Sequence, residues 1–293
     1  MKPPPFEYYA PKTVDEALAH LAEFGYDAKV LAGGQSLVPM MNFRLAQPSI
    51  IVDINNLSEL FNIRPDDGGG LRIGAMARHH QVETNALVAE RAALITDAMP
   101  HIATVQVRSR GTFGGSLAHA DPAAELTAVS VALEGSLLLR SQKGERWVPA
   151  NEFFAGLFTS VLEPDELLIE VKFPALPGRT GCALVEVARR PHDFALVGVA
   201  AVVTLGEGDR CQQARIVFFS VGDGPVVAHQ GAELLKGKEL TSEALHAAAE
   251  TAAKRDIDPG SDIHATSEYR RHLAGVLSFR ALSKAYERAR GAG

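Results

Sequence analysis

The 293-residue sequence predicts an α+β fold in three consecutive parts. Residues 1–57 read as a small α/β unit, because short apolar runs alternate there with a helical pattern. Residues 58–176 mix short strands and helices, and a cluster of proline and glycine at 174–178 marks the next boundary. Residues 177–293 hold three apolar runs and then three helical segments, which predicts a three-stranded antiparallel sheet with three helices.

The N-terminal part starts extended and then turns into a helix at Thr13. The spacing of Thr13 and Glu16 is that of a capping box, and Gly25 is placed to end the helix. The other elements expected in this part are a buried strand at Ala28–Leu31, a short helix capped by Ser36, and a strand at Ile50–Ile54.

The middle part should pair two short strands across a glycine turn at 68–70. Its expected elements, in order, are strands Phe61–Arg64 and Leu71–Ala75, a helix at Glu90–Ile102, a glycine-rich loop, a buried helix at Leu126–Leu133, a hairpin of Ser136–Ser141 with Glu145–Pro149, and a strand at Glu166–Phe173.

The C-terminal part begins with three apolar runs that have the composition of strands. We expect strands at Ala183–Ala188, Val197–Leu205 and Arg215–Val221, followed by helices near 229–236, 242–254 and 266–289.

Composition and charge exclude several classes of protein. The chain is 46% hydrophobic with a net charge of −6, so nothing indicates nucleic-acid binding. Its two cysteines, Cys182 and Cys211, are too few for an iron–sulfur cluster or a closed zinc site, and they fit the reducing cytoplasm. The longest apolar run, Ala195–Leu205, is shorter than the roughly 20 residues that span a bilayer, so we expect a soluble chain without a transmembrane segment.

Two glycine-rich stretches, 28–37 and 104–125, are the least ordinary features of the sequence. Glycines there can adopt positive φ and let backbone amides face an anion, while Thr112 and Ser116 add hydroxyl groups. Two such loops suggest a diphosphate ligand. A glycine-rich turn with a purely structural role is the alternative for each loop taken alone.

The sequence gives little support for other kinds of functional site. Neither loop has the G-x-G-x-x-G spacing of a Rossmann fold, and the lysine-serine phosphate loop is absent. Ser36 and Ser116 do not lie in G-x-S-x-G elbows, which argues against a hydrolase. The histidines have no spacing that gathers them with a carboxylate, so we expect no metal site.

Both loops resemble the FAD-binding medium subunit of molybdenum hydroxylases, of the carbon monoxide dehydrogenase, quinoline oxidoreductase and xanthine dehydrogenase type. The resemblance rests on Lys29-Val-Leu-Ala-Gly-Gly-Gln-Ser36 and on the run from Arg108 to Ala124. Further similarity lies at Asn42–Pro48, Ile51–Ile54, Arg189–Ala195 and Tyr269–Ala274, so it covers nearly the whole chain.

The resemblance implies a PCMH-type FAD-binding domain of two subdomains, 1–57 and 58–176, followed by a medium-subunit domain at 177–293. It implies no catalytic or metal-binding residue in this chain. The residues that it assigns to FAD are Lys29, Val30, Leu31, Ala32, Gly33, Gly34, Gln35, Ser36, Leu37, His101, Ile102, Thr104, Gly111, Thr112, Gly114, Gly115, Ser116, Ala118, Asp121, Leu168 and Phe194.

Leu168 and Phe194 have a competing structural interpretation, and Asp121 needs a specific partner. Leu168 in mid-strand is typical of a core residue, whereas Asp121 beside a glycine loop would have to face a donor such as a sugar hydroxyl. Phe194 stands where several relatives have a tyrosine against the isoalloxazine ring, so the ring can stack but no phenol is present. Its alternative role is to fill the core between domains.

We therefore expect an electron-transfer subunit that carries FAD. The resemblance implies a large partner with a molybdenum cofactor, a small partner with iron–sulfur clusters, and a dimer of heterotrimers that passes electrons to an external acceptor. The alternatives are a stand-alone FAD-dependent oxidoreductase and a nucleotide-binding scaffold without catalysis. The substrate and the acceptor cannot be read from the sequence.

Overall fold

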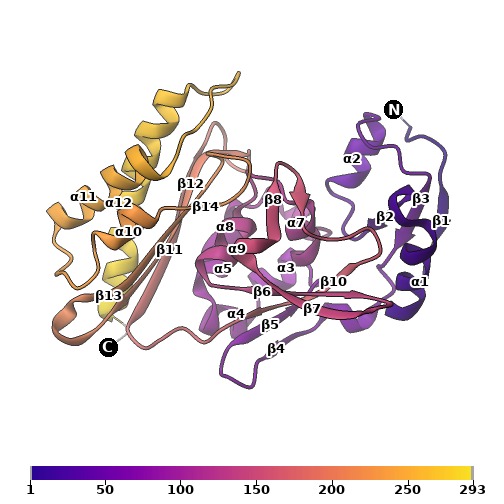
Figure 1. The fold of residues 1–293 in the computed structure, drawn as a ribbon, viewed down its shortest axis with the longest axis horizontal. Coiled ribbons are helices and arrows are strands. Elements are labelled where there is room, and N and C mark those ends of the chain that lie inside the picture. The colour runs from indigo at the N-terminus through magenta and orange to yellow at the C-terminus, as the bar shows by residue number, and fades with distance from the viewer. Residues whose placement is uncertain (1, 292–293) are drawn as a thin grey trace.

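The computed structural model describes residues 2–291 and places three main β-sheets in chain order along the molecule (Figure 1). The N-terminal sheet lies at one end, the C-terminal sheet with its helices at the other, and a five-stranded sheet lies between them. This arrangement confirms the α+β class.

The N-terminal sheet is parallel, with the order β1 (Glu7–Tyr9), β3 (Ile50–Asp53), β2 (Ala28–Leu31). Helix α1 (Val14–Phe24) begins as predicted, since Thr13 Oγ1 accepts a 3.2 Å hydrogen bond from Glu16 N, and it ends at Gly25 with φ +51°. The expectation that β2 is buried is wrong beyond its first residue, because β2 is an edge strand. A 3-10 turn (Gly25–Asp27), helix α2 (Leu37–Asn42) and a 3-10 turn (Ser58–Phe61) complete this part.

The middle sheet has the order β4 (Ile63–Pro65), β5 (Leu71–Gly74), β10 (Leu167–Phe173), β6 (Ser136–Ser141), β7 (Gly144–Pro149), and all its pairs are antiparallel. Both strand pairs that the sequence predicts in this part are present, as β4 with β5 and β6 with β7. The accompanying elements are α3 (His79–Glu83), α4 (Ala86–Arg91), α5 (Ala93–Ala98), a 3-10 turn (Met99–His101), α6 (Val105–Arg108), α7 (Phe113–His119), α8 (Glu125–Ala132), α9 (Ala150–Phe153) and the hairpin β8 (Phe154–Gly156) with β9 (Thr159–Ser160).

Two predictions for the middle part need correction. The helix expected at Glu90–Ile102 is divided into α4, α5 and a 3-10 turn, because Ala92 leaves the helical region with φ −144° and ψ 54°. The glycine-rich stretch 104–125 is not an open loop, since it contains α6 and α7. The predicted buried helix is confirmed as α8, in which every residue is buried.

The C-terminal sheet contains β11 (Thr180–Ala188), β12 (Ala195–Leu205), β13 (Cys211–Phe219) and β14 (Val226–Val227) in that order. Beyond the predicted three strands, the two-residue β14 pairs with β13. The predicted helices are α10 (His229–Glu233), α11 (Ser242–Thr251) and α12 (Ser267–Gly291), and a π-helical turn (Ala252–Asp256) follows α11.

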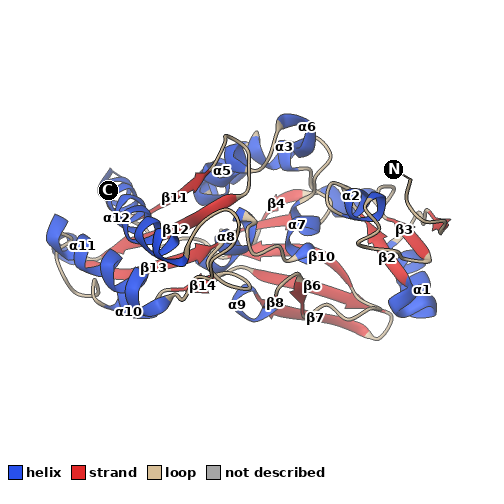
Figure 2. Cartoon of the chain, turned by 90° about the horizontal axis from the view of Figure 1, so that it is seen from above, coloured by secondary structure: helices blue, strands red, loops and turns tan. Residues whose placement is uncertain are grey.

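The longest apolar run of the sequence, Ala195–Leu205, forms strand β12. It is the central strand of a sheet that is covered on both faces, by the C-terminal helices on one side and by α5 and α8 on the other (Figure 2). Its side chains alternate between these two cores, so all eleven residues are buried.

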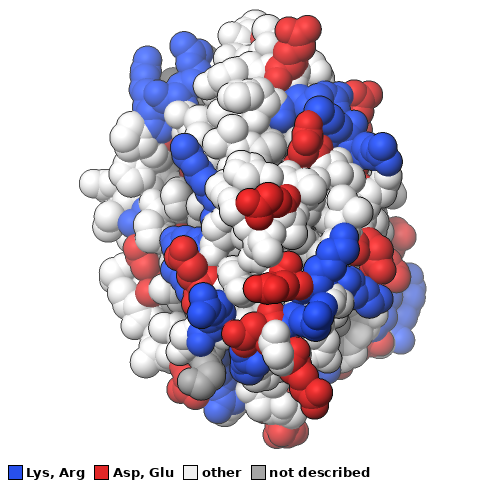
Figure 3. Space-filling model, turned by 90° about the vertical axis from the view of Figure 1, so that its left-hand side faces the viewer, with Lys and Arg blue, Asp and Glu red and all other residues white. Residues whose placement is uncertain are grey.

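The C-terminal helix is tied to the middle part of the chain by Arg288. Its guanidinium donates to both carboxylate oxygens of Asp97 in α5, at 2.5 and 3.1 Å, and to the carbonyl of Cys182 in β11. This charge-assisted contact fixes how the C-terminal sheet lies on α5. The face of the molecule at the C-terminal end exposes basic and acidic side chains interspersed with one another (Figure 3).

Candidate functional site

The two glycine-rich stretches come into contact at Gly33, which lies 77 positions before Arg110 in the sequence. A Cβ atom at Gly33 would meet the carbonyl oxygen of Arg110 and would lie 2.8 Å from the Cα atom of Gly111, well inside the normal contact distance. Gly115 approaches the same segment, since its Cβ would lie 3.5 Å from Ala32. The glycines are thus required for the close approach of two backbones.

The first stretch presents a row of unsatisfied amides between β2 and α2. Within residues 2–291, no acceptor receives the backbone N–H groups of residues 33–37. Gly34 has φ +74°, as the sequence predicted for a glycine loop. Successive amides of this kind, next to a helix start, form a concavity that suits an anion.

The sequence predicts that Ser36 caps α2, but the structure shows no capping hydrogen bond from its side chain. Ser36 occupies the position before Leu37, but its side chain accepts no amide hydrogen bond, because its backbone is already helical with φ −102° and ψ −50°. The exposed Ser36 hydroxyl and the exposed Gln35 side-chain amide lie beside the row of backbone amides, and Gln35 Nε2 donates to Gly33 O at 3.2 Å.

The second stretch differs from the prediction. Gly111, Gly114 and Gly115 all have negative φ, and the last two lie in the first turn of α7. Their amides are also in use: Gly114 N donates to Ala75 O at 2.8 Å and Gly115 N donates to Thr112 Oγ1 at 3.1 Å. A Cβ on Gly114 would lie 2.5 Å from that of Ala75, so this segment is a packing surface against the end of β5.

Arg78 joins the two stretches, and sequence reasoning missed it. Its guanidinium donates to the carbonyl of Arg110 and, at 2.6 Å, to Asn55 Oδ1, while Asn55 Nδ2 donates at 2.8 Å to the carbonyl of Ala32. The Arg78 guanidinium also lies over the Phe61 ring at 5.4 Å. No pattern in the sequence marks this residue, since its partners come from three separate segments.

His79 packs against the second stretch at Gly111 and Thr112. Its Nε2 lies 2.9 Å from the carbonyl oxygen of Thr112, and a Cβ on Gly111 would lie 2.9 Å from its Nδ1. Burial lowers the pKa of His79 to about 4, so the imidazole is neutral at pH 7.

Thr104 is exposed at the start of α6, and its carbonyl accepts from Arg108 N. Arg108 is buried and holds the preceding turn by donating to the carbonyls of Ile102 and Ala103, at 3.0 and 2.9 Å. Its charge is balanced by Glu83, whose Oε2 lies 3.0 Å from Arg108 Nε.

The remaining predicted residues fall into different environments. Asp121 Oδ1 accepts from Ala123 N at 2.8 Å, so one of its oxygens closes the turn before α8. Leu168 is only 4% exposed and belongs to the main core, as its structural interpretation proposed. Lys29 is exposed, Val30 and Leu31 are half-buried on β2, and Ala118 is half-buried on α7.

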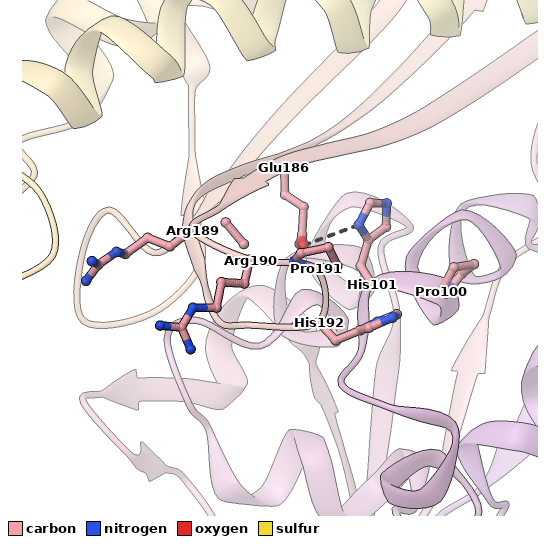
Figure 4. A pocket seen from close by; sticks show the side chains of 8 residues that line it. Pro100, His101, Glu186, Arg189, Arg190, Pro191 and His192 are labelled. Carbon is pink, nitrogen blue, oxygen red and sulfur yellow. Dashed lines mark ion pairs between the residues drawn. The ribbon is translucent and has the colours of Figure 1, made fainter.

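Phe194 does not fill a core. It is 70% exposed at the end of the loop 189–194, so this alternative is wrong. The same loop lines an open pocket of about 360 Å³ whose opposite wall is Pro100 and His101 (Figure 4). His101 Nδ1 lies 3.2 Å from Glu186 Oε1 across this pocket.

The arrangement therefore offers a row of backbone amides without acceptors among the described residues, a glycine-packed contact between two loops, and a polar pocket farther along the chain. Within the ranges that the structure covers, His, Cys, Asp and Glu side chains do not gather in threes around a possible metal position. Nor does any of these helices combine the length and apolar character needed to cross a membrane.

Known proteins match this chain over nearly its full length. Residues 4–176 match the family model described as the FAD binding domain in molybdopterin dehydrogenase, and residues 183–285 match the CO dehydrogenase flavoprotein C-terminal domain. The chain is 41% identical to the 6-hydroxypseudooxynicotine dehydrogenase complex subunit alpha of Paenarthrobacter nicotinovorans, over 99% of this chain and 97% of that protein. It is 40% identical to the carbon monoxide dehydrogenase medium chain of Hydrogenophaga pseudoflava, over 98% and 99%.

Solved structures agree in fold. The carbon monoxide dehydrogenase of Hydrogenophaga pseudoflava matches with a TM-score of 0.94 and 39% identity, covering 98% of this chain and 99% of that chain. The quinoline 2-oxidoreductase of Pseudomonas putida 86 matches with a TM-score of 0.93 and 38% identity, covering 99% of both chains.

Proposed function

This chain belongs to the family of FAD-binding medium subunits of molybdopterin dehydrogenases, and we propose from that premise that it is the FAD-carrying electron-transfer subunit of a molybdenum-containing hydroxylase or dehydrogenase complex. Bound FAD would supply the redox chemistry, accepting electrons and passing them on. The residues of this chain bind and orient the cofactor.

The observation that carries the proposal is the row of free amides at residues 33–37. A diphosphate fits there, because five consecutive N–H donors lack any acceptor among the described residues and lie next to the start of a helix. Gly33 supports the fit, since a side chain there would separate the first stretch from the second.

We propose that different residues contact different parts of the cofactor. Backbone amides of 33–37 and the Ser36 hydroxyl would hold the diphosphate, while the α7 segment forms the opposite wall through its glycines. Arg78, Asn55 and His79 would keep the two walls together. Phe194, exposed and aromatic, is proposed to lie against the isoalloxazine ring.

We also propose the partners implied by the family. A large chain would carry the molybdenum cofactor and oxidise the substrate, a small chain would carry iron–sulfur clusters, and two such heterotrimers would associate. Support comes from relatives that are named as subunits or medium chains of dehydrogenases. The two buried free cysteines, Cys182 and Cys211, support a reducing, cytoplasmic location.

The parts 1–57, 58–176 and 177–293 are proposed as two FAD-binding subdomains and a medium-subunit domain. The support is that each range contains one of the three main sheets. The family matches at 4–176 and 183–285 are consistent with the second boundary.

The test is to express the chain alone and together with the two candidate partner chains, and to follow the flavin absorption after the complex's substrate is added. We expect yellow protein with stoichiometric FAD in both preparations, and bleaching by substrate only in the assembled complex. Bleaching of the isolated chain by the substrate would support the stand-alone oxidoreductase instead. Absence of FAD in every preparation would contradict the proposal itself.

A further inference from the structure

Arg78 places a positive charge at the point where the two glycine-rich stretches meet. Its guanidinium donates to the carbonyl oxygen of Arg110, and a Cβ atom at Gly33 would collide with this same oxygen. Asn55 links the guanidinium to the residue before Gly33, since Asn55 Oδ1 accepts from Arg78 at 2.6 Å and Asn55 Nδ2 donates to Ala32 O at 2.8 Å. The charge therefore lies beside the Gly33 end of the row of backbone amides that lack acceptors.

The Arg78 guanidinium makes no ion pair with an Asp or Glu side chain of residues 2–291. Asp53 acts on it only from farther away, and the Asp53 oxygens accept from neutral donors, Tyr8 Oη at 2.7 Å and Asn55 N at 2.8 Å. Burial and the positive charge of Arg110 lower the pKa of Arg78, but an arginine keeps its charge at neutral pH. Arg78 is thus a cation that no described carboxylate neutralises.

Other arginines with limited exposure do have a carboxylate partner. The buried Arg108 is paired with Glu83, and the half-buried Arg288 is paired with Asp97. Arg78 is half-buried as well, so part of its guanidinium is withdrawn from water without an opposite charge. Such a withdrawal costs free energy, and an anion bound beside the guanidinium would offset that cost.

Arg78 also keeps hydrogen-bond donors in reserve. Its contacts with Arg110 and Asn55 use one N–H each from Nη1 and Nη2, whereas Nε–H donates to no acceptor in the described part of the chain. The ring of Phe61 lies 5.4 Å from Arg78 Cζ and limits how the guanidinium can turn. A planar guanidinium held in this way, with free N–H groups along its edge, suits the oxygens of a phosphate group.

We propose that Arg78 is a further binding residue for the diphosphate of FAD, and that it acts through its charge in addition to its two hydrogen bonds between the stretches. The inference rests on the proposed function, because it takes the amides of residues 33–37 as the diphosphate site. The ligand class follows from charge, since phosphate groups bring the negative charge that Arg78 lacks, whereas the uncharged ribityl chain does not.

A charge role and a purely structural role predict different responses to salt. Dissolved ions weaken attraction between separated charges, because the screening length falls from about 10 Å at 0.1 M to about 3 Å at 1 M ionic strength. The hydrogen bonds of Arg78 to Arg110 and Asn55 lie within the folded chain and persist at either concentration. If Arg78 only held the stretches together, its removal would weaken FAD by the same factor at low and high salt.

The first experiment measures the dissociation constant for FAD on the FAD-free chain, by quenching of flavin fluorescence, at about 0.05 M and about 0.5 M potassium chloride. Arg78→Gln should weaken FAD roughly tenfold at the lower concentration and roughly threefold at the higher one. Arg78→Lys keeps the charge, so it should keep the salt dependence of the parent. The control is Arg280→Gln on α12, another exposed arginine without a carboxylate partner among the described residues, which should match the parent at both concentrations.

The second experiment tests the anion site without a flavin. Inorganic pyrophosphate at about 10 mM should raise the thermal unfolding midpoint of the FAD-free parent above that in potassium chloride of equal ionic strength, and the rise should be smaller in Arg78→Gln. An equal rise in both proteins would overturn the inference.

The outcomes separate this inference from the proposed function. A loss of FAD affinity in Arg78→Gln that is the same at both salt concentrations would overturn the charge role. If Arg78→Gln does not fold, as judged by urea unfolding, the Lys variant decides, because a folded Arg78→Lys without the parent's salt dependence would also overturn it. Failure of the parent to bind FAD would contradict the proposed function, while the pyrophosphate measurement would still decide whether Arg78 serves an anion site.

Discussion

Gly33→Ala is the substitution that most directly tests how the two loops form one site. The added methyl group would overlap the carbonyl oxygen of Arg110 and approach Gly111 Cα to 2.8 Å. Both neighbours are backbone atoms, so no flexible side chain can move aside. The first and second stretches must therefore separate, and the bonds that link them through Arg78 and Asn55 must stretch.

The expected size of the effect follows from the cost of overpacking, which is typically ~1–3 kcal/mol. If FAD binds only when the two stretches are in contact, the same free energy is lost from binding. At 1.4 kcal/mol for each factor of ten, affinity should fall by about 5- to 150-fold.

The assay is the dissociation constant for FAD, measured by flavin fluorescence quenching on the FAD-free chain, together with urea unfolding. Gly260→Ala, where a Cβ meets nothing within 4 Å, should change neither quantity. Gly25→Ala, in open space but at φ +51°, should lower stability by about 1 kcal/mol without weakening FAD. Equal FAD affinity in Gly33→Ala and Gly260→Ala would refute the idea that contact between the two stretches holds the cofactor.

Two further predictions concern His79 and Phe194. Because burial lowers the pKa of His79 from 6.5 to about 4, its contribution to stability is complete above pH 6.5 and is lost as the pH falls toward 4, by roughly 3 kcal/mol in total. Urea unfolding at pH 7 and pH 5 should show about 2 kcal/mol of this loss, and His79→Gln should remove it; an unchanged pH dependence in the variant would exclude His79 as the cause. Phe194→Tyr should shift the flavin reduction potential or oxygen reactivity at unchanged FAD content, and a variant identical to the parent in potential, spectrum and oxidase rate would show that the ring does not contact the flavin.

Much of the fold could be predicted from local patterns. The start of α1 at Thr13, its end at Gly25 and the strands of the C-terminal sheet follow from capping chemistry and short-range periodicity, which act within a few residues. The apolar run of β12 likewise indicated a strand, whereas its burial on both faces is seen only in the structure. The two glycine stretches and their resemblance to a known family were sufficient to indicate FAD.

What the glycines do was decided by tertiary structure. The sequence suggested that Gly114 and Gly115 open their amides to a ligand, yet those amides bond to Ala75 and Thr112, whereas the amides of residues 33–37 have no acceptor among the described residues. The reason is that an amide's partner is set by which backbone packs against it, and Ala75 lies about 40 residues away in sequence.

The contact between His101 and Glu186 shows the same limit more clearly. His101, Glu125 and Glu186 lie in a 3-10 turn, a helix and a strand, and no spacing in the sequence connects them. Burial raises the pKa of Glu125, and the hydrogen bond to Glu186 raises the pKa of His101; both effects arise only when the C-terminal sheet packs on α5 and α8. Local sequence determined the elements and the cofactor class, whereas long-range burial determined which groups in them hold charge.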